Sequence, residues 1–201
     1  MSTWAWYDEN GNGTAFAAKT RHQDVRHILA PFMESVDLLG GHILDVGCGS
    51  GRDTRAFSLA GYQVTAIDPS ETMIQETRDL VETGPLLLPP ILEQRGVLEV
   101  TETEVYHGIW ACNSLLHLPH RDQTDALRRL RNALKPGGSL FVSYKYGSTQ
   151  RLAEDGRFFN DMTFGQLGTL LEFVGLVPRT MTLTDHKGVP FWINALCTRP
   201  A

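Results

Sequence analysis

The sequence predicts an α/β fold in which a mostly parallel sheet has helices on both faces and ends in an antiparallel hairpin. Residues 42–70 read as strand, glycine turn, helix and strand, which is one half of a nucleotide-binding unit. Apolar segments and helical segments then keep alternating along the chain, which is typical of a parallel sheet. Two final apolar segments, 176–183 and 191–198, are joined by a short polar turn and indicate the hairpin.

The first strand is expected over 42–46, a short apolar run interrupted only by Asp45. Strands covered by helices on both faces have such near-continuous apolar runs. The strand leads into the glycine-rich turn 47–51, where the backbone can take positive φ and touch a ligand. A helix over 52–60 follows, and the next strand delivers Asp68 to the sheet edge where α/β proteins bind ligands.

The remaining elements follow the same alternation in what we expect to be a single domain of residues 1–201. Before the sheet, a helix over 15–39 is predicted, interrupted near Pro31, and residues 1–40 are predicted to act as a helical lid. Ser70 is a good N-cap for a helix that runs to Glu82. Further strands are expected at 91–94, 97–99, 108–112 and 139–145, and further helices at 122–134 and 163–174.

The glycine turn departs from the dinucleotide fingerprint G-x-G-x-x-G. Gly47 and Gly49 fit that pattern, but Arg52 stands at its third glycine position and Gly51 comes one residue early. Asp45, two residues before the turn, would repel a phosphate and suits a cationic ligand. The pattern therefore favours S-adenosylmethionine, which has an ammonium, a sulfonium and no phosphate.

These motifs resemble those of the class I S-adenosylmethionine-dependent methyltransferases. The resemblance rests on the glycine turn with Asp45, on Asp68-Pro69-Ser70, and on the segment 130–138 before the fifth strand. It implies a Rossmann-like, seven-stranded, mostly parallel sheet. Tyr7-Asp8 with Thr20-Arg21 resembles the lid of the small bacterial subgroup that includes the tellurite-resistance methyltransferases. One departure is His107, because many relatives start the fourth strand with Asp.

The resemblance implies positions for S-adenosyl-L-methionine and its product S-adenosyl-L-homocysteine. We expect the ribose at Asp68, the methionine moiety at the glycine turn, and the adenine near the second and third strands. The implied cofactor residues are Tyr7, Thr20, Asp45, Gly47, Cys48, Gly49, Arg52, Asp53, Asp68, Pro69, Ser70, Met73, Leu98, Glu99, Ala111, Cys112 and Leu115.

Candidate acceptor residues follow the fourth and fifth strands or bracket the last hairpin. They are His117, Tyr146, Arg151, Arg157, Asp185 and Trp192. His117 is either a base or a residue that stabilises its turn. Arg151 and Arg157 suit a small anionic acceptor, or they belong to an ordinary solvated loop. Cys112 lacks the motif of a nucleophilic methyltransferase cysteine, so the identity of any catalytic residue stays open.

Composition limits the partners. The net charge is −5 and no basic run is present, which does not suit a large nucleic-acid footprint. Three widely spaced cysteines show no metal-binding spacing, so we expect no metal. No segment is long and apolar enough for a membrane span. We expect a cytoplasmic monomer or homodimer without a membrane or nucleic-acid partner.

The sequence thus predicts S-adenosylmethionine-dependent methyl transfer to a small-molecule acceptor. Two alternatives stay open. One is an RNA or protein methyltransferase that acts with a partner subunit, and the other is a non-catalytic S-adenosylmethionine-binding regulator. The glycine turn does not separate the last alternative from an enzyme, because binding and turnover require the same cofactor contacts.

Overall fold

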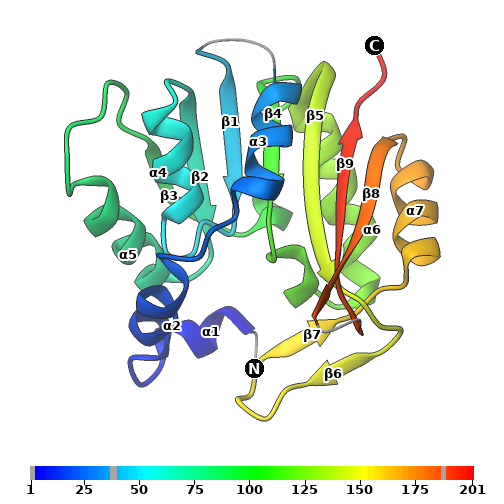
Figure 1. The fold of residues 1–201 in the computed structure, drawn as a ribbon, viewed down its shortest axis with the longest axis horizontal. Helices are drawn as coiled ribbons and strands as arrows, with labels where there is room; N and C mark the ends of the chain where they lie inside the picture. The colour runs from blue at the N-terminus through cyan, green and yellow to red at the C-terminus, as the bar shows by residue number, and fades with distance from the viewer. Residues whose placement is uncertain (1–2, 37–39, 187–188) are drawn as a thin grey trace.

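A computed structural model describes residues 3–36, 40–186 and 189–201 (Figure 1). Nine strands, seven α-helices and two 3-10 turns are assigned within these residues. The strands are β1 His42–Val46, β2 Gln63–Asp68, β3 Ile91–Gln94, β4 Tyr106–Ala111, β5 Leu134–Lys145, β6 Gln150–Leu152, β7 Phe158–Asn160, β8 Val177–His186 and β9 Val189–Thr198. The helical elements are α1 Thr3–Asp8, α2 Asn12–Thr20, α3 Arg26–Ser35, α4 Arg52–Leu59, α5 Glu71–Val81, η1 Val97–Glu99, η2 Leu115–His117, α6 His120–Ala133 and α7 Phe164–Phe173.

The main sheet has seven strands in the order β3-β2-β1-β4-β5-β9-β8. The first five of these run parallel, and β9 then pairs antiparallel with both β5 and β8. The predicted fold class is therefore confirmed. The strand order reverses direction between β1 and β4, and in open α/β sheets this switch point is where ligands bind.

Helices cover both faces of the sheet. On one face α3, α4 and α5 pack on side chains such as Ile43, Trp110 and Phe141. On the other face α6 and α7 pack on the alternate residues of the same strands, among them Leu44 and Ile109. Because side chains alternate along a strand, each central strand contributes to both cores. The two cores pack against both faces of the strands. This packing fixes the position of the sheet edge at which the candidate site lies.

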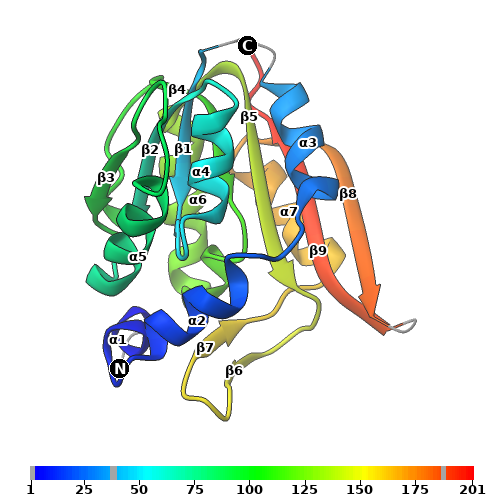
Figure 2. The same cartoon turned by 60° about the vertical axis from the view of Figure 1, so that its left-hand side comes forward.

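The N-terminal region differs from the predicted helix over 15–39 with its interruption near Pro31, of which residues 37–39 lie outside the described structure. The break falls between α2 and α3, where Asp24 Oδ1 accepts the backbone N–H of Arg26 at 3.0 Å and starts a new helix. Pro31 lies inside α3, which continues past it. Helix α3 buries Phe32 against the sheet and is thus part of the core layer, so only α1 and α2 extend over the sheet edge (Figure 2).

Two other segments differ from expectation. Residues 97–99 form the turn η1 instead of a strand, because the Glu99 carboxylate accepts the Gly96 N–H at 2.7 Å and closes the chain on itself. The polar segment after β5 forms the small β6–β7 hairpin, which lies beside α1 and α2 below the carboxyl ends of the strands (Figure 2). No helix in the described part of the chain has the length and apolar character needed to cross a membrane.

Candidate active site

The glycine turn after β1 is held against the tips of two neighbouring strands. The N–H groups of Gly47 and Cys48 both donate to the Ile67 carbonyl, at 2.7 and 3.1 Å. Gly47 has a φ of +74°, and a Cβ atom there would lie 2.5 Å from the Ser114 Cβ after β4. Only glycine satisfies both conditions, so the turn can lie directly on the tips of β2 and β4.

Asp68 ends β2 and ties this turn to the next helix. Its two carboxylate oxygens accept the N–H groups of Gly49 and Ser70, at 3.1 and 3.0 Å. Burial raises the pKa of Asp68 to about 6, although both backbone hydrogen bonds oppose that shift. Each carboxylate oxygen has a second lone pair, so Asp68 can also accept the two hydroxyl protons of a ribose.

A second acidic group lies behind the turn. The Asp45 carboxylate is buried and accepts the Thr54 hydroxyl at 2.6 Å. Burial and the charge of Asp53 raise the pKa of Asp45. Asp53 itself is paired with Arg52 at 2.7 Å and accepts the Trp110 indole N–H at 2.9 Å. The raised pKa favours the neutral carboxyl, so Asp45 acts on the site through its hydrogen bond with Thr54.

Two polar residues follow β4 that the sequence analysis did not select. Asn113 has a φ of +57°, and its amide oxygen and N–H both bond the Ser143 hydroxyl of β5. Positive φ at a non-glycine residue is a strained backbone state that is common in functional sites. The neighbouring Ser114 Oγ is buried without a protein partner. The sequence signal that could have identified Asn113 and Ser114 was their position directly after the predicted fourth strand.

The short helix α1 closes over this edge and is tied down at both ends. Thr3 Oγ1 accepts the Phe158 N–H at 3.0 Å and so joins α1 to β7. At the other end, the Asp8 carboxylate accepts the Ser70 hydroxyl at 2.6 Å and the Thr72 N–H at 3.0 Å. A terminal segment held by such contacts is ordered, in contrast to an untethered chain end.

A cavity of about 890 Å³ lies between this lid, the glycine turn and the strand tips. Most of the predicted cofactor residues line it: Tyr7, Thr20, Gly47, Cys48, Gly49, Arg52, Asp53, Asp68, Pro69, Met73, Leu98, Glu99, Cys112 and Leu115. Three do not, because the side chains of Asp45, Ser70 and Ala111 are almost completely buried in the protein interior. Further lining residues that were not predicted include Trp4, Phe16, Asn113, Ser114 and Phe158.

Of the predicted acceptor residues that can be placed, only His117 lines the cavity; Tyr146, Arg151, Arg157 and Trp192 do not. Arg151 is paired with Asp161 at 2.7 Å, and Arg157 is paired with Asp155 at 2.7 Å. Both arginines also lie over the Phe159 ring, at 4.8 and 5.4 Å from its centre. The expected pair of free arginines facing an anionic acceptor is therefore not present.

Two other predictions concern this region. The side chain of Asp185 lies outside the described part of the structure, so its role stays a prediction. Within the residues that the structure describes, no cluster of histidine, cysteine and acidic side chains has the arrangement of a metal site.

Residues 43–138 match a protein family described as a methyltransferase domain. This match covers just under half of the chain and includes the glycine turn and Asp68. A ubiquinone biosynthesis O-methyltransferase of Xanthomonas oryzae is 32% identical over 108 residues, which are 54% of this chain and 44% of that protein. The match thus spans less than half the length of this curated relative.

Solved structures share the whole fold. The 1,6-didemethyltoxoflavin-N1-methyltransferase of Burkholderia thailandensis, solved with S-adenosylhomocysteine, has a TM-score of 0.70 at 21% identity, over 94% of this chain and 87% of that one. The cyclase SpnF has a TM-score of 0.80 at 16% identity, over 100% and 97% of the two chains. At these identities the likeness establishes the fold, and a fold alone does not establish the reaction.

Proposed function

We propose that this protein transfers the methyl group of S-adenosyl-L-methionine to a small-molecule acceptor enclosed in the cavity under α1 and α2. The observation that supports this most is the single cavity that joins the glycine turn, the Asp68 carboxylate and the His117 ring. Its volume of about 890 Å³ lies at the upper end of the roughly 300–1,000 Å³ of small-molecule sites. It is therefore large enough for the cofactor together with a compact acceptor.

The residues of the cavity fit this cofactor. Asp68 offers acceptors to the ribose hydroxyls, and Gly47 and Gly49 line the cavity beside it. Ser114 also lines the cavity at the same strand tip, with its hydroxyl buried and without a protein partner. When bound, the cofactor supplies an electrophilic methyl group on sulfur. The protein then has to orient the acceptor and exclude water, which is what the tethered lid does.

Several finer points belong to this proposal. We propose that the protein acts in the cytoplasm as a monomer or homodimer, with no nucleic-acid partner. The net charge of −5 and the enclosed cavity support a small acceptor over an RNA. The likeness of its lid motifs to the tellurite-resistance subgroup makes tellurite one acceptor to test. The whole of residues 1–201 would act as one domain.

The direct test combines binding with turnover. Titration calorimetry should show S-adenosylmethionine and S-adenosylhomocysteine binding but no NAD binding. Release of S-adenosylhomocysteine should then be measured with a phenol, a small thiol, a halide, tellurite, selenite and bulk RNA. Turnover with a small molecule supports the proposal. Turnover only with RNA would favour the partner-dependent alternative, and binding without any turnover would favour a regulator.

A further inference from the structure

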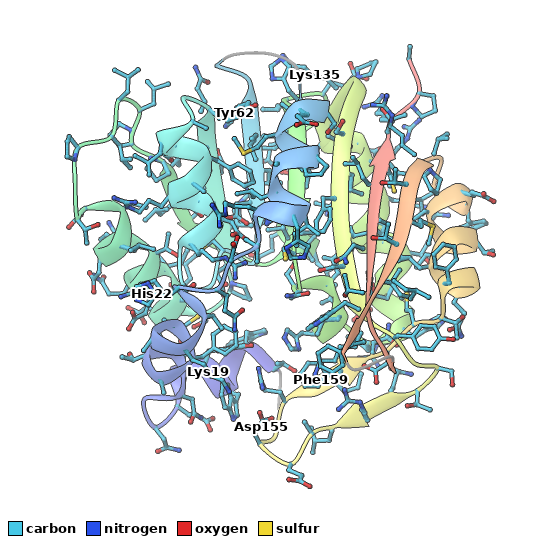
Figure 3. The ribbon with its side chains drawn as sticks, in the orientation of Figure 1. Lys19, His22, Tyr62, Lys135, Asp155 and Phe159 are labelled. Carbon is cyan, nitrogen blue, oxygen red and sulfur yellow. The ribbon has the colours of Figure 1, made fainter. Side chains whose placement is uncertain are left out.

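His117 occupies an unusual position between three segments that are distant in sequence. It ends the turn η2 after β4, its ring lies 4.9 Å from the Phe159 ring of β7, and it faces the Tyr7 ring of α1 at 6.2 Å. Figure 3 shows Phe159 between the lower end of the sheet and the β6–β7 hairpin, at the opposite end of the sheet from Lys135. His117 is therefore part of the cavity wall and not of the core.

Hydrogen bonding fixes the tautomer of this ring. Nδ1 lies 2.8 Å from the Phe158 carbonyl oxygen. A carbonyl can only accept, so Nδ1 carries the proton and Nε2 keeps its lone pair. The neighbour of Nε2 is the Tyr7 hydroxyl at 3.5 Å, the outer limit of a hydrogen bond. An acceptor hydroxyl that approaches more closely can replace this loose contact.

The surroundings keep the ring neutral. Burial lowers the pKa of His117 to about 4, and the charges of Arg157 and Lys145 act in the same direction while the Phe158 bond and Asp155 oppose it. Tyr7 is the titratable group that faces the ring from α1. Among the described residues, no carboxylate bonds to the ring. At neutral pH His117 thus presents a proton acceptor and no positive charge.

Apolar side chains form part of the cavity wall beside His117. Leu118, Leu152 and Phe158 contribute to it, as does Trp4 of the lid. Arg121 and Asp122 also line the cavity, and the exposed Arg121 guanidinium lies 3.7 Å from the Asp122 carboxylate. Arg151 and Arg157 are paired with carboxylates and do not line it. The apolar side chains give an uncharged ring a surface to pack on, whereas an anion placed against them would lose hydration.

We infer that His117 is the general base of an O-methylation and that the acceptor is a neutral phenol or enol whose hydroxyl bonds to Nε2. This inference rests on the proposed methyl transfer. The acceptor oxygen forms a bond to the methyl carbon as the carbon–sulfur bond breaks with its electron pair on sulfur. The hydroxyl proton passes to Nε2 and later to water. Sulfur loses its positive charge as the imidazole gains one, so the net charge of the site does not change.

Two contacts position the base. The Phe158 carbonyl that orients the ring is held in turn by Thr3, whose hydroxyl also donates to it at 3.4 Å. Closure of α1 and orientation of the base are therefore coupled through one carbonyl group. Thr3 is a positioning residue, because it acts on the acceptor only through Phe158 and His117.

The test compares a phenol that carries its proton with a phenol that has largely lost it. His117→Asn keeps an N–H that can donate to Phe158 but removes the basic nitrogen. At about pH 8, methylation of an un-ionised phenol should slow by about 100-fold or more, the range typical of general-base catalysis. Methylation of a nitrophenol, which is mostly ionised at that pH, should change little. The matched control is His120→Gln, because His120 is exposed and does not line the cavity.

Two measurements separate this inference from a loss of structure. The melting temperature and the S-adenosylhomocysteine affinity of His117→Asn should equal those of the wild type. In cofactor-free protein, nitrogen NMR of the labelled ring should show the proton on Nδ1. Equal slowing of both phenols, or an Nε2-protonated ring, would overturn the assignment of the base.

The acceptor panel distinguishes the remaining outcomes. A wild-type protein that methylates thiols or tellurite but no phenol or enol overturns the acceptor class while the proposed methyl transfer stands. A wild-type protein that neither binds the cofactor nor methylates any acceptor overturns the proposed function and this inference with it. Phenol turnover that needs the His117 imidazole supports both.

Discussion

Lowering the pH from about 7 to 5 should weaken binding of S-adenosylhomocysteine about tenfold. The perturbation acts on Asp68, whose pKa burial raises to about 6. At pH 5 about one Asp68 in ten is ionised, so the binding-competent carboxylate form is reduced by about the same factor, or about 1.4 kcal/mol. Above pH 7 the carboxylate is almost fully ionised and the affinity should level off.

Titration calorimetry between pH 5 and 7.5 at constant ionic strength measures this effect. The matched control is Asp68→Asn, which cannot ionise and should bind the cofactor product about 2–3 kcal/mol more weakly, with no dependence on pH in this range. His117, whose pKa lies at about 4, contributes little there. An affinity that is equal at pH 5 and pH 7 in the wild type would refute the assignment of Asp68 to the ribose.

The same carboxyl group makes the stability of the cofactor-free protein depend on pH. Lower pH favours stability, whereas it disfavours cofactor binding. Its pKa is about 3.8 in the unfolded chain and about 6 in the folded one, so the folded protein holds this proton more tightly. Its contribution to stability is therefore fully present below pH 4 and is lost as the pH rises through 6, by up to about 3 kcal/mol. Cofactor-free Asp68→Asn should consequently melt no lower than the wild type at pH 7.5, even though the amide satisfies only one of the two backbone N–H groups.

Three substitutions test the remaining contacts. Gly47→Ala should lower stability by about 1–3 kcal/mol and weaken cofactor binding, because φ is +74° and the new Cβ meets the Ser114 Cβ at 2.5 Å. Thermal melts measure the stability and calorimetry measures the affinity; unchanged values of both would contradict the tight fit of the turn. Asp8→Ala should cost about 1 kcal/mol and loosen the lid, measured as faster amide exchange in α1 with α5 as the internal reference. Arg151→Ala should leave the acceptor KM unchanged, since its guanidinium pairs with Asp161 outside the cavity; a large rise in KM would return it to the site.

The sheet, and the placement of the glycine turn and Asp68 at its edge, were predictable from sequence because their signals are local. A glycine turn needs positive φ wherever it occurs, and Asp68 follows an apolar strand directly, so residue order alone places both at the sheet edge. The start of α5 was also predictable, because Ser70 is a good N-cap and its hydroxyl accepts the Met73 N–H at 3.1 Å. These elements depend on neighbours within a few residues.

The acceptor half was not predictable, because it depends on contacts between distant segments. The two arginines have no local feature that shows whether they face a ligand; their pairing with Asp155 and Asp161 appears only once the β6–β7 hairpin forms. Likewise, the tautomer of His117 is set by the Phe158 carbonyl, 41 residues further along the chain. A sequence pattern identifies which residues are available, and tertiary pairing decides which of them remain free.

Asp45 suggested a cationic ligand from the sequence, but other carboxylates face the cavity. The Asp45 carboxyl is buried behind the glycine turn, so it does not touch the cavity. Burial and the charge of Asp53 raise the pKa of Asp45, which favours its neutral form, and Asp53 is paired with Arg52. Of the three acidic residues around this turn, only Asp53 and Asp68 line the cavity. Their carboxylates would attract a cationic ligand and repel a phosphate. The preference for a sulfonium and an ammonium therefore depends on Asp53 and Asp68, and not on Asp45.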